Sequence, residues 1–339
     1  MRRLTLAAAL AAALLTTHVT SAAAKSPNRD AHRSATLAII GDTPYGDAQV
    51  AQFPRDIAEI NADPDVRGVI HLGDIKNGST RCDDSYLAAR LADFETFEDP
   101  LVYTPGDNEW TDCHRANNGG YLPTERLAKL RSLFFARPGH TLGGNGWVLP
   151  QSREYPENVL WSQARVVFGA VHVVGSNDGQ LPWFGDRATP ETPAETALRV
   201  EEYTAREAAA LKWIDATFLA ARLTRAPAVV IAMQADMWDV SAPAGTLTAY
   251  EPIKARIAAR AAAFGKPVLL LEGDSHNFLV DTPAGMPANL TRVVVQGSTS
   301  VPHEWLRLRV DPGADRPFSC ENVVFGTGAT TPCPGPLAP

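Results

Sequence analysis

Four aspartates share one local pattern, in which a run of apolar residues ends in Gly-Asp. The runs are LAIIGD ending at Asp42, VIHLGD at Asp74, VYTPGD at Asp107 and LLLEGD at Asp274. The chain holds six Gly-Asp pairs, where random placement of its 25 glycines and 22 aspartates gives about two. Short apolar runs are typical of buried strands, and glycine lets the chain turn sharply away from a strand. The pattern therefore predicts four carboxylates at strand ends.

These carboxylates could do metal chemistry. The carboxyl ends of parallel strands meet at one edge of a sheet, where α/β proteins bind their ligands. Four carboxylates at such an edge repel one another unless something neutralises them, and a divalent cation is the simplest solution. Each aspartate could instead cap the helix that follows its strand. Four repeats of the same pattern favour a metal site over four separate caps.

Strand-like and helix-like segments alternate along the chain, which indicates an α/β protein. Two strands with no helix between them, at 159–164 and 166–175, indicate mixed sheets. The Gly- and Pro-rich segment 139–158 is expected to be a loop. The other expected strands are 36–40, 66–72, 101–104, 228–233, 267–271, 292–295 and 305–310. The expected helices are 54–61, 85–97, 124–136, 190–223 and 253–264.

Residues 1–24 have the layout of a secretory signal peptide. Arg2 and Arg3 precede an apolar run over 4–15, and small residues follow at 21–24. The apolar run is too short to span a bilayer, and an uncleaved anchor is the alternative. The protein is therefore expected to be secreted or periplasmic, with no stable membrane span after cleavage. The remaining expected divisions are a polar linker at 25–35, one domain at 36–312 and a Pro- and Gly-rich tail at 313–339.

The charge of the chain argues against some partners. The chain carries 31 Lys and Arg and 38 Asp and Glu, for a net charge of -7, and loss of Arg2 and Arg3 with the signal peptide leaves -9. Bulk charge of this sign does not favour nucleic acid or an anionic membrane surface. An anionic small molecule would need a local site with a metal ion. The oligomeric state is left open.

Four cysteines, an even number in an exported chain, indicate disulfides. They are Cys82, Cys113, Cys320 and Cys333, and three pairings are possible. Zinc ligation by cysteine is not expected, because no two of them are close in sequence.

The order of the motifs resembles that of the calcineurin-like metallophosphoesterase superfamily, which includes the purple acid phosphatases. That pattern runs Asp-x-His, Gly-Asp, Gly-Asn-His-Asp/Glu, a His after a strand, and Gly-His-x-His. The matching segments here are GDTPYG (41–46), GD (73–74), GDNE (106–109), VVIAMQ (229–234) and GDSH (273–276). The resemblance covers residues 36–310. It implies two mixed β-sheets packed face to face and flanked by helices, a four-layer sandwich.

The resemblance also implies two adjacent metal positions. The first would be held by Asp42, Asp74 and His276. The second would be held by Asp74, Asp107, Gln234 and Asp274. The second has only oxygen donors, which suit Mg²⁺, Mn²⁺ or Ca²⁺, whereas the imidazole of the first could accompany Mn²⁺, Fe or Zn²⁺. One or two divalent ions per chain are therefore expected.

The chain departs from the family pattern where the family has histidine. The replacements are Pro44, Asn108, Gln234 and Asp274. The family histidine at position 108 stabilises or protonates the leaving group; Asn108 cannot donate a proton in that way, but it can hydrogen-bond a phosphoryl oxygen. In the same loop, His114 is a candidate acid or a surface residue, and Arg115 a candidate phosphate ligand.

Three further residues have structural interpretations. His71 and His172 lie within strands and are expected in the core. Tyr45 is expected to pack at the mouth of the site, where its hydroxyl could also supply an oxygen.

The motif layout favours one disulfide pairing. Cys82 follows Asp74 by eight residues and Cys113 follows Asp107 by six, so a Cys82–Cys113 bond would join two metal loops. Cys320–Cys333 would then close the tail.

Three functions are compatible with these features. The first is an exported phosphoesterase that hydrolyses phosphate mono- or diesters through a metal-activated water. The second is a non-catalytic relative that binds a metal or ligand at the cell surface, which the lost histidines motivate. The third is a metal-dependent hydrolase of another ester.

Overall fold

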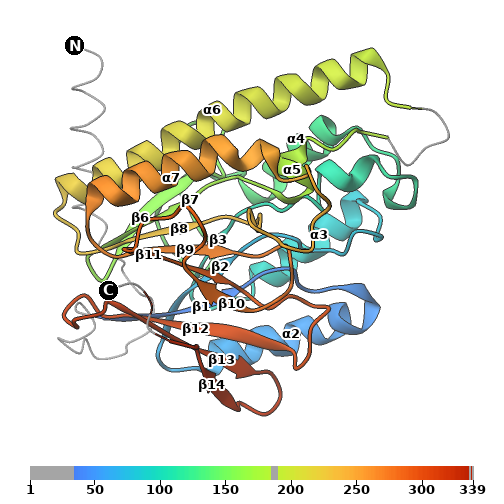
Figure 1. Ribbon diagram of the computed structural model, residues 1–339. Coiled ribbons are helices and arrows are strands. Elements are labelled where there is room, and N and C mark those ends of the chain that lie inside the picture. The colour runs from blue at the N-terminus through green and yellow to red at the C-terminus, as the bar shows by residue number, and fades with distance from the viewer. Residues whose placement is uncertain (1–33, 185–189, 336, 338–339) are drawn as a thin grey trace.

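Two seven-stranded mixed sheets lie face to face with helices on both outer sides (Figure 1). The computed structural model describes residues 34–184, 190–335 and 337. The strand order is β14-β13-β12-β1-β2-β3-β4 in the first sheet and β10-β11-β9-β8-β7-β6-β5 in the second. The predicted fold class, an α/β sandwich of two mixed sheets, is confirmed.

The bounds of the elements are as follows. The first sheet consists of β1 (Ala35–Ile40), β2 (Val66–His71), β3 (Pro100–Tyr103), β4 (Leu142–Gly143), β12 (Glu304–Val310), β13 (Phe318–Val324) and β14 (Thr330–Pro332). The second consists of β5 (Leu149–Pro150), β6 (Val159–Gln163), β7 (Val166–Ala170), β8 (Val229–Ala232), β9 (Val268–Glu272), β10 (Leu279–Asp281) and β11 (Leu290–Val294). The α-helices are α2 (Gly46–Ala62), α3 (Asp84–Phe94), α4 (Pro123–Phe134), α5 (Gly175–Gly179), α6 (Pro193–Leu223) and α7 (Glu251–Phe264). Short 3-10 turns are η2 (Thr111–His114), η3 (Ala116–Asn118) and η4 (Thr248–Tyr250).

Three hydrophobic cores separate the four layers. Between the sheets, Leu37 and Ile39 of β1 pack in one cluster with Phe168 of β7. Their neighbours Ala38 and Ile40 belong to the cluster under α2, α3 and α4, because successive side chains of a strand point to opposite faces. A third cluster joins α6 and α7 to the outer face of the second sheet. Strand β1 is therefore buried on both faces, as its continuous apolar run predicts.

Within each sheet, the central strands run parallel to their neighbours. Strands β1, β2 and β3 form the parallel part of the first sheet, and β7, β8, β9 and β11 that of the second. The loops with the four Gly-Asp pairs leave from the carboxyl ends of β1, β2, β3 and β9. This topology brings the loops to one edge of the sandwich.

Helix α2 begins eight residues before its predicted start at Pro54. Proline suits the first turn of a helix because it has no N–H to donate, so the prediction began the helix there. The chain instead turns helical from Gly46, where the Gln49 side-chain oxygen accepts a hydrogen bond from the Tyr45 N–H at 2.8 Å. Pro54 lies inside the helix. The prediction of the helix was right and its start was wrong.

Two segments expected to lack regular structure contain strands. Within 313–339, β13 pairs antiparallel with β12, and β14 pairs with β13, so this segment extends the first sheet. Within 139–158, β4 and β5 add short edge strands to the two sheets. Backbone pairing with a neighbouring strand overrides the Gly- and Pro-rich composition in both cases.

The predicted signal peptide at 1–24 lies outside the described residues. So does the predicted linker at 25–35, apart from its last two residues, and Ala35 already belongs to β1. In the part of the chain that the structure describes, no helix is both long enough and apolar enough to cross a membrane.

Candidate metal centre

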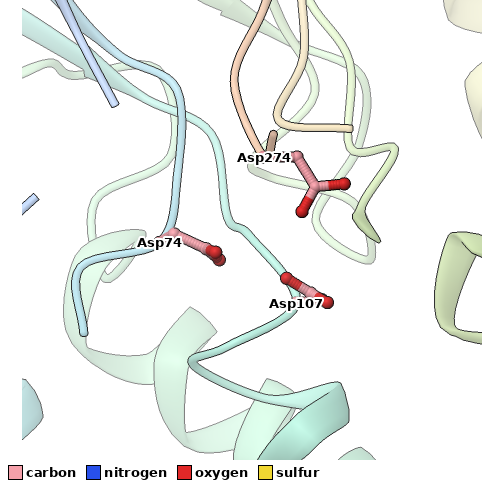
Figure 2. Close-up of side chains that lie close together, drawn as sticks. All are labelled: Asp74, Asp107 and Asp274. Atoms are coloured by element: carbon pink, nitrogen blue, oxygen red, sulfur yellow. The ribbon is translucent and has the colours of Figure 1, made fainter. Parts of the chain in front are cut away.

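Three of the predicted aspartates come together at the carboxyl edge. Asp74, Asp107 and Asp274 each place a carboxylate oxygen within 4.8 Å of the others (Figure 2). We call these three residues the candidate metal centre, shortened below to the metal centre. Two ligands on opposite sides of a hard cation lie at most about 5 Å apart, which is twice a Ca²⁺–oxygen distance. The three oxygens therefore fit around one divalent ion.

Asp42 and His276 lie beside the metal centre. Both carboxylate oxygens of Asp42 accept a hydrogen bond from the Asp274 N–H, at 3.0 and 3.1 Å. The Nε2 atom of His276 is 3.7 Å from Asp42 Oδ1, and its Nδ1 is 2.8 Å from the Thr299 hydroxyl. Among the described residues the metal centre is the one group of three such ligands. The first predicted metal position thus has two of its three ligands together, Asp42 and His276.

Two of the motif glycines lie so close to a carboxylate of another loop that no side chain would fit. A Cβ atom on Gly106 would lie 2.0 Å from Asp74 Oδ1, and one on Gly273 would lie 2.6 Å from Asp42 Oδ2. Neither distance leaves room for a carbon atom. Glycine in these pairs therefore lets a carboxylate from a neighbouring loop pack against the backbone.

The aspartates themselves have unusual backbone conformations. Asp42, Asp74 and Asp274 have φ of 51°, 56° and 68°, and His276 has 63°. These left-handed values are uncommon outside glycine, and residues held in them concentrate at functional sites. Backbone strain at these four residues is therefore typical of a functional site, in which the positions of the side chains are kept at the expense of local stability.

Two of the three residues of the metal centre are buried, and the third, Asp274, is half-buried. Asp74 is 2% and Asp107 6% exposed. Within the described ranges, no Lys or Arg forms an ion pair with Asp42 or with any residue of the metal centre. Burial, and then repulsion from neighbouring carboxylates, raises the pKa of Asp74 and Asp274 well above the usual range. A divalent cation would relieve both effects, so the donor set fits a hard ion such as Mg²⁺, Mn²⁺ or Ca²⁺.

Gln234 contacts the metal centre through its nitrogen. The Gly175 N–H donates to Gln234 Oε1 at 2.6 Å. The amide nitrogen faces Asp274 Oδ1 at 3.0 Å and Asp107 Oδ1 at 3.4 Å. The sequence suggested Gln234 as an oxygen ligand, but the buried Gly175 N–H needs an acceptor and takes that oxygen. In this arrangement Gln234 orients two carboxylates and does not offer its oxygen to a cation.

Tyr45 and Asn108 contact Asp74 directly. Asp74 Oδ2 accepts hydrogen bonds from the Tyr45 hydroxyl at 3.0 Å and from Asn108 Nδ2 at 2.5 Å. The Tyr45 ring also packs edge-on against His276, with centroids 5.1 Å apart. Behind the site, Glu109 accepts from the N–H groups of Asp74 and Gly106, at 3.1 and 2.6 Å. Tyr45 thus belongs to the polar wall of the site, and its place at the mouth stays a prediction.

Arg115 and His114 differ in their surroundings. A Cβ atom on Gly78 would meet Asn108 Oδ1 at 3.1 Å and Arg115 Nη1 at 3.3 Å, so Arg115 lies beside Asn108. Its guanidinium also pairs with Asp112 at 2.6 Å. His114 is buried, and its Nδ1 accepts a hydrogen bond from the Phe184 N–H at 2.8 Å. His114 is therefore not the surface residue of the alternative interpretation, and its role as an acid stays a prediction.

The core interpretation of two histidines is confirmed. His71 and His172 are fully buried. His71 Nε2 donates to the Thr43 carbonyl at 2.9 Å, and burial lowers the pKa of His71 to about 4. His172 Nδ1 is 2.9 Å from Glu157. Both lie in the core and not at the metal centre.

Two residues of the site carry no motif. Asp112, in η2, is buried, and burial followed by repulsion from Asp107 raises its pKa to about 7. Ser176, in α5, donates to Asp107 Oδ2 at 2.6 Å and to Asp112 Oδ1 at 3.1 Å. The only sequence signal at 175–179 is the turn-like composition GSNDG, which does not indicate a contact with Asp107.

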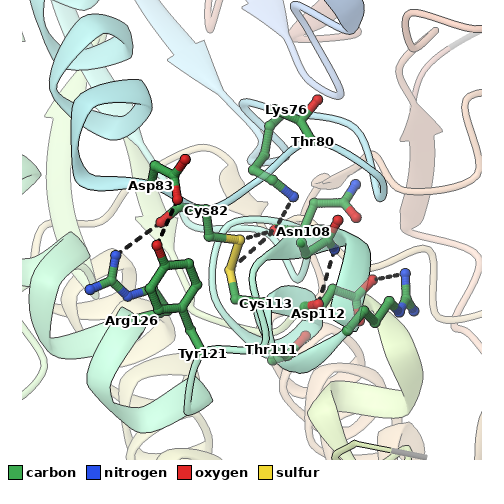
Figure 3. The surroundings of a disulfide bond; sticks show 12 residues. Lys76, Thr80, Cys82, Asp83, Asn108, Thr111, Asp112, Cys113, Tyr121 and Arg126 are labelled. Carbon is green, nitrogen blue, oxygen red and sulfur yellow. Dashed lines mark hydrogen bonds and ion pairs between the residues drawn. A yellow bond between two sulfur atoms is a disulfide. The ribbon is translucent and has the colours of Figure 1, made fainter. Parts of the chain in front are cut away.

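Both predicted disulfides are present. Cys82 pairs with Cys113 and Cys320 with Cys333. Figure 3 shows that the Cys82–Cys113 bond lies against the backbone carbonyl of Asn108, which is 3.6 and 3.7 Å from the two sulfurs. The Lys76 ammonium donates to the same carbonyl at 2.7 Å. The disulfide and Lys76 therefore fix the loops after β2 and β3 together beside Asp74 and Asp107.

Comparisons with known proteins give distant likenesses. No protein-family model matches the chain, and no curated protein matches it by sequence. Among solved structures, GAP50, the anchor in the inner membrane complex of Plasmodium, aligns with 88% of this chain and 88% of its own, at 10% identity and a TM-score of 0.45. A candidate 5′-nucleotidase from Staphylococcus aureus, in complex with alpha-ketoglutarate, aligns with 90% of this chain and 55% of its own, at 12% identity and a TM-score of 0.36.

Proposed function

We propose that this chain is an exported, metal-dependent phosphoesterase that hydrolyses phosphate mono- or diesters. The observation that carries the proposal is the convergence of three carboxylates at the carboxyl edge, two of them buried and one half-buried, with no Lys or Arg ion-paired to them in the described part of the chain. The order of the motifs, which resembles that of the metallophosphoesterases, supports phosphate esters as the substrate class.

Asp74, Asp107 and Asp274 would hold a divalent cation, with Asp42 and His276 next to it. The bound ion supplies a Lewis acid that lowers the pKa of water and neutralises phosphoryl charge. Gln234 keeps two of the carboxylates oriented toward it through hydrogen bonds at 3.0 and 3.4 Å. Mn²⁺, Mg²⁺ and Ca²⁺ are the ions proposed for the metal centre, and Fe or Zn²⁺ remains an option beside His276.

Arg115 would bind the phosphoryl group, whereas Asn108, whose amide N–H groups are bonded to Asp74 and Tyr45, would orient Asp74 beside it. The two side chains flank Gly78, and a guanidinium can donate two parallel hydrogen bonds to phosphate oxygens. The ion pair with Asp112 fixes the direction of the Arg115 guanidinium. Asn108 cannot protonate a leaving group. Unless His114 supplies that proton, esters with acidic alcohols, such as aryl phosphates, should be the better substrates.

The test combines metal content with a substrate panel. Protein purified without chelator should contain close to one equivalent of divalent metal by elemental analysis. It should hydrolyse 4-nitrophenyl phosphate or bis(4-nitrophenyl) phosphate, lose this activity after chelation and regain it with Mn²⁺. Persistence of full activity in the chelated protein would contradict the proposal.

The non-catalytic alternative has one observation in its favour. Asn108 stands where the family has its histidine acid, and its amide is already bonded to Asp74 and Tyr45. A metal-binding protein without hydrolytic activity on any phosphoester would support this alternative.

Export is proposed from the predicted signal peptide at 1–24. The two disulfides support an oxidising compartment. Amino-terminal sequencing of the mature protein should begin near residue 25, and a mature protein that begins at Met1 would contradict cleavage.

A further inference from the structure

The turn after β7 forms a wall of the metal centre that no sequence motif marks. Within α5, Ser176, Asn177 and Asp178 have φ of 54°, 56° and 54° in succession. L-amino acids other than glycine rarely adopt this left-handed conformation, because Cβ crowds the following carbonyl. A glycine at position 176 would adopt it without strain. Serine at position 176 therefore has a strained backbone conformation that glycine would avoid. Its side chain, however, makes contacts that glycine could not make.

Contacts outside the metal centre hold this turn in place. Asp178 forms an ion pair with Arg206, and both side chains are 1% exposed. Asp178 also accepts a hydrogen bond from the Val174 N–H at 3.1 Å. Asn177 Oδ1 accepts one from the Ala249 N–H at 2.9 Å. Left-handed residues persist where their surroundings over-determine them, and these contacts do so for the turn.

The turn orients both oxygens of Asp107. The Ser176 hydroxyl donates directly to Oδ2 at 2.6 Å. Gly175 acts on Oδ1 through Gln234, whose oxygen accepts from the Gly175 N–H and whose nitrogen then faces Oδ1. A Cβ atom on Gly175 would lie 2.8 Å from Asp107 Oδ2 and 2.5 Å from Asp274 Oδ1. The backbone of the turn therefore packs directly on two ligands of the metal centre.

Ser176 also connects the metal centre to Arg115. Its hydroxyl lies 3.1 Å from Asp112 Oδ1, and the other oxygen of Asp112 pairs with Arg115 at 2.6 Å. Ser176 thus bridges two carboxylates. One is Asp107 of the metal centre, and the other is Asp112, which pairs with Arg115.

We propose that Ser176 is a positioning residue, whose hydroxyl holds Asp107 in the orientation that binds a divalent cation. The inference rests on the proposed metal centre and adds a residue to it. Groups that hydrogen-bond to metal ligands typically change metal affinity by about 10- to 100-fold when they are removed. A purely structural role for Ser176 would change stability and leave metal affinity as it was.

Ser176→Gly distinguishes a positioning role from a purely structural one. It removes the hydroxyl, which should weaken metal binding, and it relieves the left-handed strain, which should not lower stability. We expect Mn²⁺ affinity, measured by isothermal titration calorimetry on chelator-stripped protein, to fall by about 10-fold. The metal-free variant should melt at or above the wild-type temperature. Asn177→Gly is the control, because it relieves the same strain one residue along and keeps the Ser176 hydroxyl, although it also removes the hydrogen bond to the Ala249 N–H. Its Mn²⁺ affinity should equal that of the wild type.

The outcomes are distinguishable. Wild-type Mn²⁺ affinity in Ser176→Gly would overturn the positioning role and leave the metal centre intact. An equal loss of affinity in both variants would assign the effect to the shape of the turn and would also overturn the role of the hydroxyl. Failure of the wild-type protein itself to bind Mn²⁺ would overturn the proposed function, and this inference with it.

Discussion

Two neighbouring groups of largely buried carboxylates differ in whether a basic side chain is paired with them. In the first group, Arg292 of β11 contacts Asp236 at 2.6 Å, Glu272 at 3.3 Å and Asp281 at 2.9 Å. We call these four residues the Arg292 cluster. The second group is the metal centre, which has no Lys or Arg paired with it among the described residues. The chain therefore pairs a cation directly with the first group, whereas Lys76 and Arg115, which lie beside the second, bond to the Asn108 carbonyl and to Asp112 instead.

The metal centre lacks the direct ion pair that Arg292 gives to its neighbouring carboxylates. A buried charge without a partner costs several kcal/mol even after the protein relaxes, and Arg292 offsets that cost within its own cluster. Around Asp74 and Asp107 the nearest donors are the neutral side chains of Tyr45, Asn108 and Ser176. Neutral donors orient carboxylates but do not cancel their charge. The single charge of the nearby Lys76 does not balance three carboxylates, so the rest of the positive charge would come from protons or from a bound ion.

The largest effect is expected from Asp74→Asn. The substitution keeps the size of the side chain and removes one charge and one metal-binding oxygen. Phosphoesterase activity should fall by about 1,000-fold, as when a group that stabilises transition-state charge is lost, and metal content should fall with it. Asn108→Ala, measured in the same assay, should lose less activity and keep its metal. Unchanged activity in Asp74→Asn would mean that the site is not catalytic.

Arg292→Met should act on stability and leave metal binding in place. Removal of one partner leaves buried carboxylates unpaired, and the free energy of unfolding in urea should drop by about 3–5 kcal/mol. Arg309→Met is the matched control, since Arg309 is 57% exposed and pairs with Asp311 at 3.5 Å. Its loss should stay within about 1 kcal/mol. An Arg292 variant as stable as the control would remove the contrast between the two groups.

Stability of the metal-free protein should depend on pH. The raised pKa of Asp42, Asp74 and Asp274 means that the folded state holds protons that the unfolded state has lost. Stability should therefore fall as pH rises from the unfolded carboxyl value near 4 toward the raised folded values. Asp112, with a pKa raised to about 7, adds to this fall between about pH 4 and pH 7. The melting temperature of chelated protein should be higher at pH 5 than at pH 8.

Added Mn²⁺ provides the control for this pH effect. A saturating ion takes the place of the protons, so the difference between pH 5 and pH 8 should shrink. An equally large difference with and without Mn²⁺ would place its origin outside the metal centre.

The smallest effect is expected from the disulfides. The double variant Cys82→Ala, Cys113→Ala frees the loops after β2 and β3, and Mn²⁺ affinity should fall by about 10-fold. The double variant Cys320→Ala, Cys333→Ala is the control, because that bond joins strand β13 to the residue that follows β14. It should lower the melting temperature without changing Mn²⁺ affinity. Equal effects on affinity would show that the Cys82–Cys113 bond has no special relation to the site.

The sequence alone was sufficient to predict those site residues that stand within a recognisable local pattern. Asp42, Asp74, Asp107 and Asp274 each follow a buried apolar run, and parallel strands bring such positions to one edge. The alternation of strands and helices predicted an α/β protein, and the strand pair within 159–175 predicted mixed sheets. Their number and face-to-face packing were implied only by the resemblance of the motif order to a known family. The start of α2 was missed, because Pro54 resembles a first-turn residue although it lies inside the helix.

Other parts of the site depend on contacts between distant segments. The oxygen of Gln234 is taken by the N–H of Gly175, 59 positions away, and no local pattern shows this. Ser176 reaches Asp107 only because the Asp178–Arg206 pair holds a left-handed turn. Asp112 lies in a short 3-10 turn whose residues have no periodicity to detect.

The central claim is that the uncompensated carboxylates at the carboxyl edge are a divalent-cation site. Thermal melts of chelator-treated protein, with Mn²⁺, Mg²⁺ or Ca²⁺ added back, test it most directly. An ion present at 100 times its dissociation constant adds about 2.7 kcal/mol to the stability of the folded state. The melting temperature of the wild type should therefore rise by several degrees with at least one of these ions, and that of Asp74→Asn should respond much less. If no divalent ion at millimolar concentration shifts the wild-type melt, the four aspartates are caps and hydrogen-bond acceptors, and the claim is wrong.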